Sequence, residues 1–151
     1  MNKHTKSIKR VSKPWGYELW ISDGQNGNFA LKKIMFQAGN RTSLQVHRHK
    51  FETTYVLSGH GSIFVSKDKF DIDKFLNEGM TTQEVEDFEK TFTEIELVEG
   101  TAFDIEPGYV HRVVANTDLV FIEASTTELD DVIRLQDDQG RQHGKIEQEH
   151  Q

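Results

Sequence analysis

The 151-residue sequence contains no cysteine, which excludes a disulfide framework, a thiolate metal site and a cysteine nucleophile. It has no apolar run approaching about 18 residues, so we expect no membrane-spanning helix. Basic residues are in the minority, with 18 Lys and Arg against 25 Asp and Glu, and the net charge of −7 argues against a nucleic-acid binder. The polar stretch 1–10 is not followed by the apolar segment of a secretory signal. These absences favour a soluble cytoplasmic protein, and its seven histidines are the feature to follow.

The length suits one domain with polar ends. Segments 1–12 and 142–151 contain few apolar side chains, so we expect both to be flexible around a domain over 13–141. Within that domain, short β-rich runs alternate with turn signals such as Ser58-Gly59-His60-Gly61, a spacing typical of a β-sandwich or barrel. The stretch 129–135 is interpreted as a short final helix or turn.

The stretch 67–91 breaks this rhythm, because its apolar and charged residues follow helical spacing. Thr81 or Thr82 could cap a helix, with Glu84 or Glu86 nearby to complete the cap. We predict one or two short helices inserted between strands. They would form either a solvent-exposed elbow or a flap over a pocket.

Three histidines and one glutamate can converge on a single site. In a strand over 43–49, alternate residues share a face, so His47 and His49 would point the same way. Glu52 begins the next strand and can come round to face them, and a turn at Pro107-Gly108 delivers His111 to another strand. Imidazole ligands suit zinc, copper, iron and nickel, and oxygen ligands favour manganese. The pattern therefore predicts a site for a divalent metal.

These motifs resemble the paired motifs of the cupin superfamily: His-x-His-x-x-Glu ending at Glu52, with Gly59 seven residues later, and Pro-Gly-x-x-His ending at His111. The stretch 43–52 and the opening Lys13-Pro-Trp-Gly16 resemble the type II phosphomannose isomerase (mannose-6-phosphate isomerase) cupin domain. The likeness covers residues 11–141 apart from the insertion.

The resemblance implies an all-β fold, the cupin double-stranded β-helix or jelly-roll barrel, with the short helical insertion at 67–91. It implies a homodimer and a small-molecule substrate, with no nucleic-acid or membrane partner. It also implies a cofactor, one divalent metal ion that would be Zn, Mn, Fe, Co or Ni. The metal ligands carried over by position are His47, His49, Glu52 and His111.

The function that the resemblance implies is a metal-dependent aldose–ketose isomerase acting on a sugar phosphate, in nucleotide-sugar or polysaccharide metabolism. This chemistry needs a base for a carbon-bound proton and cations for a phosphate. Glu106, next to the Pro-Gly turn, is the candidate base, whereas Arg112 would face away from the metal in a regular strand. Only one of Lys32 and Lys33 can face inward, and the pattern does not choose between them. The candidate substrate contacts are Gln45, Lys33, Arg134 and Arg141.

Two other functions stay open from the sequence. Two histidines and a carboxylate also form the facial triad of non-haem iron oxygenases, and cupins include dioxygenases. A metal- or sugar-binding cupin without catalysis is the third hypothesis. It is kept because family members often carry a nucleotidyltransferase domain, and this chain has no Gly-rich nucleotide loop.

Overall fold

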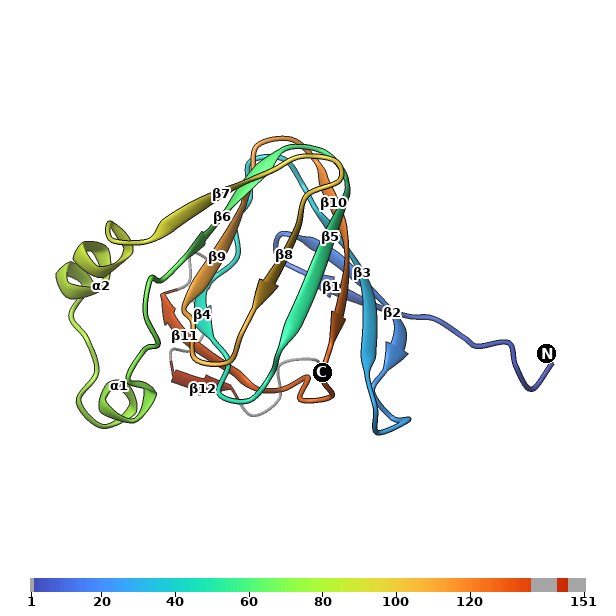
Figure 1. Ribbon diagram of the computed structural model, residues 1–151, viewed down its shortest axis with the longest axis horizontal. Coiled ribbons are helices and arrows are strands. Elements are labelled where there is room, and N and C mark those ends of the chain that lie inside the picture. The colour runs from blue at the N-terminus through green and yellow to red at the C-terminus, as the bar shows by residue number, and fades with distance from the viewer. Residues whose placement is uncertain (1, 137–143, 147–151) are drawn as a thin grey trace.

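A computed structural model describes residues 2–136 and 144–146 as two antiparallel sheets that face each other, with two helices at one side (Figure 1). The strands of sheet A are β1 (Lys9–Lys13), β2 (Gly16–Asp23), β3 (Ala30–Phe36), β5 (Glu52–Ser58), β8 (Ala102–Ile105) and β10 (Leu119–Ser125). Those of sheet B are β4 (Leu44–Val46), β6 (Gly61–Val65), β7 (Thr93–Leu97), β9 (His111–Ala115), β11 (Val132–Gln136) and β12 (Gly144–Ile146). The strand orders are β1-β2-β3-β10-β5-β8 and β12-β11-β4-β9-β6-β7, and they confirm the predicted all-β class.

The main core lies between the two sheets, because strand residues alternate between an inner and an outer face. Along β3, for example, Ile34 and Phe36 are buried while Met35 between them is half-exposed. Trp15 stacks on Phe36 with ring centroids 4.0 Å apart. The other members of this cluster are Val56, Ile63, Leu97, Ile105, Val113, Ala115, Leu119 and Phe121.

The insertion forms two helices, α1 (Ile72–Glu78) and α2 (Thr82–Glu89), which confirms the predicted helical segment. Thr81 caps α2 in a capping box with Glu84, as the sequence indicated. The helices pack on the outer face of sheet B through a second apolar cluster that includes Val46 and Val85. Among the described residues, neither helix is long and apolar enough to cross a membrane.

Two local expectations are corrected by the structure. The strand predicted over 43–49 ends at Val46, and the segment interpreted as a final helix or turn contains the start of β11. β11 is buried on both faces, although apolar and polar residues alternate along it from Ile133 to Gln136. Near the two ends of the domain, β1 pairs with β2 and β12 pairs with β11. Residues 1, 137–143 and 147–151 lie outside the described residues.

Gly59 makes the turn from β5 to β6 and explains why the motif has glycine there. Its φ is +94°, and an added Cβ would lie 2.0 Å from the Asp118 carbonyl oxygen. We expect Gly59→Ala to lower the free energy of unfolding by about 2–3 kcal/mol, through strain and overpacking. Gly39→Ala is the matched control, because Gly39 has φ +81° but an added Cβ there would have no atom within 4 Å. Urea unfolding should separate the two, and equal losses would contradict the packing argument.

Candidate metal centre

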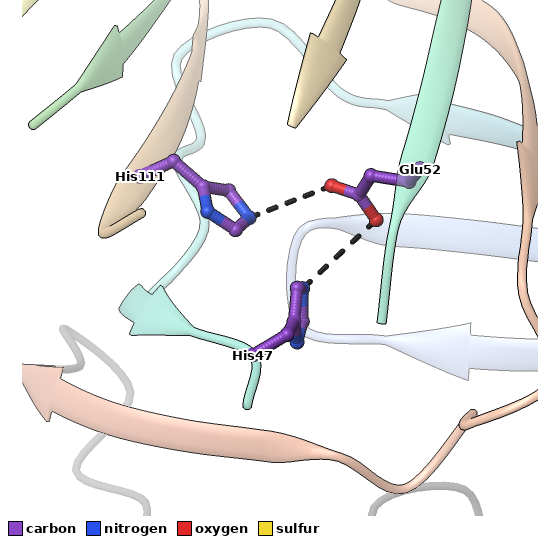
Figure 2. A group of neighbouring side chains, drawn as sticks. All are labelled: His47, Glu52 and His111. Atoms are coloured by element: carbon purple, nitrogen blue, oxygen red, sulfur yellow. Dashed lines mark ion pairs between the residues drawn. The ribbon is translucent and has the colours of Figure 1, made fainter. Parts of the chain in front are cut away.

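His47, Glu52 and His111 meet inside the barrel, with their ligand atoms all within 4.8 Å of one another (Figure 2). His47 directly follows β4, Glu52 begins β5, and His111 begins β9, so both sheets contribute. The Nε2 atom of His47 lies 3.9 Å from one carboxylate oxygen of Glu52, and that of His111 lies 3.6 Å from the other. All three side chains are buried.

Backbone carbonyls hold both imidazoles in one orientation. The Nδ1 atom of His47 lies 2.5 Å from the carbonyl oxygen of Asp131, and Nδ1 of His111 lies 3.0 Å from that of Tyr109. Carbonyl oxygens only accept hydrogen bonds, so Nδ1 of each ring carries the proton. The Nε2 atoms that face Glu52 are therefore left as acceptors, which is the form that binds a metal ion.

The distances from both imidazoles to the Glu52 carboxylate suit ligands of one divalent ion. Metal bonds of about 2.1 Å place two ligand atoms on one ion no more than about 4.2 Å apart. The two Nε2–carboxylate distances, 3.9 and 3.6 Å, lie within that limit. Burial, and then the charges of Lys50 and His111, lower the pKa of His47 well below its ordinary value, which favours the neutral ligand form.

His49, predicted as a fourth ligand, is exposed and does not belong to this group. The chain bends at Arg48 and His49, so the strand alternation that would bring His49 inward stops at Val46. The bend is organised by the carboxylate of Asp131, which accepts backbone N–H bonds from Arg48 at 3.1 Å, His49 at 2.6 Å and Lys50 at 3.0 Å. Burial raises the pKa of Asp131, but these bonds outweigh it and hold the pKa below its ordinary value.

Removal of the Asp131 carboxylate should loosen this bend. We expect Asp131→Ala to lower the free energy of unfolding by about 1–3 kcal/mol, because three N–H groups lose a charged acceptor. Metal affinity should fall by about 10–100-fold, because the bend that the carboxylate holds begins directly after His47 and would no longer fix its position. Asp130→Ala, at an exposed neighbouring carboxylate, should change the stability by less than about 0.5 kcal/mol. Urea unfolding and metal titration of both variants check this, and identical results for the two would contradict it.

The bend turns Lys50 into the barrel, where His49 was expected. Its ammonium lies 3.0 Å from Glu52 and 3.4 Å from Glu123 on β10. All three residues are buried. Next to them, Lys32 lies 3.3 Å from Glu18, and the Trp20 indole donates to Glu18 at 2.8 Å. The barrel interior therefore contains a network of paired charges around the candidate metal ligands.

The two carboxylates bonded to Lys50 have pKa values that are shifted in opposite directions from the ordinary value of a glutamate. Burial raises the pKa of Glu52, but the Lys50 charge and a hydrogen bond with Glu123 outweigh it and lower the pKa to about 2. Burial, and then the charge of Glu52, raise the pKa of Glu123 to about 6. The surroundings therefore favour the ionised form of Glu52 and the protonated form of Glu123.

A cavity of about 80 Å³ contains this network and is lined by His47, Lys50, Glu52, His111 and Glu123, together with Gln45 and Lys32. Gln45 is thus placed where the sequence predicted. Lys33 does not line the cavity, because it lies on the outer face of sheet A while its neighbour Lys32 faces inward. The helical insertion, residues 67–91, contributes nothing to the lining, so the structure favours the elbow over the flap.

Two further predicted residues are not part of the cavity lining: Arg134 is buried on β11 opposite Gln45, and Glu106 is exposed. Arg141 lies outside the described residues. Arg112 faces away from the site, as predicted, and donates from Nη1 to Glu89 of α2 at 2.9 Å.

The sequence did not indicate four charged residues of the site, and it named Lys33 in place of Lys32. The four residues are Lys13, Lys50, Glu123 and Glu18. A signal was available for Glu123 and Glu18, because each is a charged residue at an inward position of an otherwise apolar strand. Lys50 follows a bend rather than a strand, so no alternation pointed to it.

Comparison with known proteins supports a cupin fold. The solved structure of the capsular polysaccharide assembling protein CapF from Staphylococcus aureus matches 89% of this chain with a TM-score of 0.61 and 16% identity. Oxalate decarboxylase from Bacillus subtilis, described with Mn(II) centres, matches 84% with a TM-score of 0.60 and 16% identity. KdgF from Halomonas sp. matches 83% with a TM-score of 0.57 and 14% identity, over 92% of its own chain. This chain covers 33% of CapF and 30% of the decarboxylase.

A search of curated proteins finds no match for this chain. The family model described as mannose-6-phosphate isomerase C-terminal matches residues 1–90, which is more than half of the sequence. That range includes His47 and Glu52 and ends before His111. The fold of the remaining part is that of the cupin structures above. The chain belongs to the mannose-6-phosphate isomerase C-terminal family of cupin domains.

Proposed function

We propose that this cupin is a metal-dependent sugar-phosphate isomerase whose metal is held by His47, Glu52 and His111. The observation that carries the proposal is the convergence of three buried ligand atoms beside a second buried acid, Glu123, in the same cavity. A bound divalent ion would polarise the carbonyl and hydroxyl oxygens of the substrate. Three protein ligands leave coordination positions for those oxygens.

Glu123 is the group that we propose to move the proton between adjacent carbons. It lines the cavity and lies 3.4 Å from Lys50, whereas Glu106, the candidate from the sequence, is exposed. Lys50 bridges Glu52 and Glu123 and so keeps the two carboxylates at fixed positions. Gln45, whose side-chain oxygen accepts from Ser43 at 2.8 Å, is placed to contact a substrate hydroxyl.

The cavity size limits what part of a substrate enters. Sites for whole small molecules usually have volumes of about 300–1,000 Å³. At about 80 Å³, this cavity accommodates only the carbonyl end of a sugar. We therefore place the phosphate of the substrate outside, at the mouth of the barrel.

A second candidate function is favoured by the exposure of His49. Without it, the ligand group consists of two histidines and one carboxylate, which is the facial triad of non-haem iron oxygenases. A dioxygenase would consume oxygen with iron bound and would not need a sugar phosphate. An isomerase would turn over without oxygen.

The test is anaerobic incubation of the purified chain with mannose 6-phosphate, fructose 6-phosphate and a panel of pentose and heptose phosphates. Each is supplied with Zn, Mn, Fe, Co or Ni, and products are followed by NMR. Interconversion of an aldose and ketose pair that stops on chelation supports the isomerase. Oxygen uptake by the iron form, with no isomerisation in any metal form, would support the oxygenase and contradict the isomerase.

A further inference from the structure

The orientation of the His111 imidazole depends on one peptide group in the turn before β9. Nδ1 of the ring donates to the carbonyl oxygen of Tyr109 at 3.0 Å, so the direction of that carbonyl sets the direction of the ring. Tyr109 lies in the irregular segment between β8 and β9, outside both strands. Its carbonyl therefore needs a contact other than sheet pairing to hold it in place.

Ser66, the residue directly after β6, holds the other end of that peptide group. The peptide between Tyr109 and Val110 is trans and planar, so its carbonyl and its N–H point in opposite directions and turn together. The Val110 N–H donates to the Oγ atom of Ser66 at 3.0 Å. The Ser66 N–H donates back to the Val110 carbonyl oxygen at 2.8 Å. The Ser66 hydroxyl thus fixes the plane of the peptide that orients His111.

The Ser66 hydroxyl is itself held in one direction. It donates to the carbonyl oxygen of Asp68 at 2.9 Å, which directs its lone pairs to the Val110 N–H. Ser66 is 4% exposed and Val110 is fully buried, so water does not offer a substitute acceptor. A buried N–H group without an acceptor is costly, and loss of the hydroxyl would therefore favour a turn of the peptide toward another acceptor.

The start of the helical insertion binds the same turn on the side of His47. The Phe70 N–H donates to the Gly108 carbonyl oxygen at 2.9 Å, and the Gly108 N–H donates to the His47 carbonyl oxygen at 2.8 Å. These contacts join segments that are distant in sequence, and β6 lies beside β9 in the fold (Figure 1). The segment between β6 and α1 therefore supports the backbone at both candidate histidine ligands.

We propose that Ser66 is a positioning residue of the metal centre, which acts on His111 through the peptide between Tyr109 and Val110. The inference rests on the proposed function, because it takes His111 as a metal ligand. The hydroxyl keeps the imidazole in the form with a proton on Nδ1, and Nε2 is then free to bind the ion. Without the hydroxyl, the ring loses its fixed acceptor and exchanges between its two tautomers.

Thr42 provides a matched control on the same strand. Its Oγ1 atom accepts the Val113 N–H at 3.0 Å, and its own N–H donates to the Val113 carbonyl oxygen at 2.9 Å. Thr42 is also buried. The peptide that it holds, between Arg112 and Val113, lies inside β9, where pairing with β6 fixes it as well. Loss of the Thr42 hydroxyl should therefore leave His111 in place.

The first test compares Ser66→Ala with Thr42→Val, each of which removes one buried hydroxyl. Circular dichroism and urea unfolding check that both variants are folded, and the two should lose similar stability. Each chelator-treated protein is then titrated with Zn²⁺. We expect about 10–100-fold weaker binding for Ser66→Ala, the usual effect of losing a residue that orients a metal ligand, and wild-type affinity for Thr42→Val.

Nitrogen-15 NMR of the histidine rings in the metal-free proteins is the second test. We expect the Nδ1-protonated form of His111 in the wild type and in Thr42→Val, and a mixture of tautomers in Ser66→Ala. Wild-type zinc affinity or a wild-type tautomer in Ser66→Ala would overturn the proposal, as would an Nε2-protonated His111 in the wild type. A wild type that binds no zinc would contradict the proposed function instead, and the tautomers would still decide whether Ser66 orients His111.

Discussion

Replacement of Lys50 by methionine should destabilise the metal-free protein by about 3–5 kcal/mol, the usual result of removing one partner from a buried ion pair. The Lys50 ammonium is bonded to both Glu52 and Glu123, at 3.0 and 3.4 Å. Without it, two buried carboxylates remain in contact and lose the cation that lies between them. Methionine has a similar volume, so the loss of stability reports the charge rather than a cavity. Urea unfolding in the presence of a chelator measures it.

Arg48→Met is the matched control for this prediction, because it removes a cation two positions earlier in the same bend. Arg48 pairs with Asp73 at 3.1 Å, but both side chains are solvent-accessible, at 37% and 78%. Exposed pairs of this kind contribute about 0–1 kcal/mol. The account of the buried network would be contradicted if the two variants lost similar stability.

Replacement of Glu123 by glutamine should lower the isomerisation rate by about 10²–10⁴-fold, the usual contribution of a general acid–base group. Glutamine keeps the shape of the side chain but cannot accept the proton. The metal content should not change, because Glu123 is outside the group of ligand atoms. Progress curves for the aldose and ketose phosphates, together with elemental analysis of the same samples, measure both quantities.

Glu106→Gln is the control here, since Glu106 is exposed and does not line the cavity. It should keep the wild-type rate. A lower rate for Glu106→Gln together with normal turnover for Glu123→Gln would show that Glu106, the residue indicated by the sequence, is the base. Loss of metal from Glu123→Gln would instead assign that residue to the metal site.

Much of the fold followed from local pattern. Short β-rich runs between turn signals predicted a β-sandwich or barrel, and strands such as β8 and β10 are runs of this kind. The helices of the insertion and the Thr81 cap followed from helical spacing. β11 was not recognised as a strand, although apolar and polar residues alternate along it from Ile133 to Gln136, which is a signal for a strand.

The sequence predicted part of the candidate site. The residues that the structure places differently from the prediction are positioned by contacts with residues far away in the sequence. His47, Glu52 and His111 came from motif spacing, and they converge as expected. His49 turns outward because its backbone N–H bonds to Asp131, a residue 82 positions away that no local pattern connects to it. The choice between Lys32 and Lys33 likewise depends on Glu18, which pairs with Lys32 on the inner face. Contacts between distant strands, rather than the motif itself, decide which charges enter the barrel.

The most direct measurement of the central claim is the metal content of protein purified without chelator. Elemental analysis is compared for the wild type, for His47→Ala combined with His111→Ala, and for His49→Ala. The structure predicts one divalent ion per chain in the wild type and in His49→Ala, and none in the double variant. Metal retained by the double variant, or lost from His49→Ala alone, would contradict a centre built from His47, Glu52 and His111.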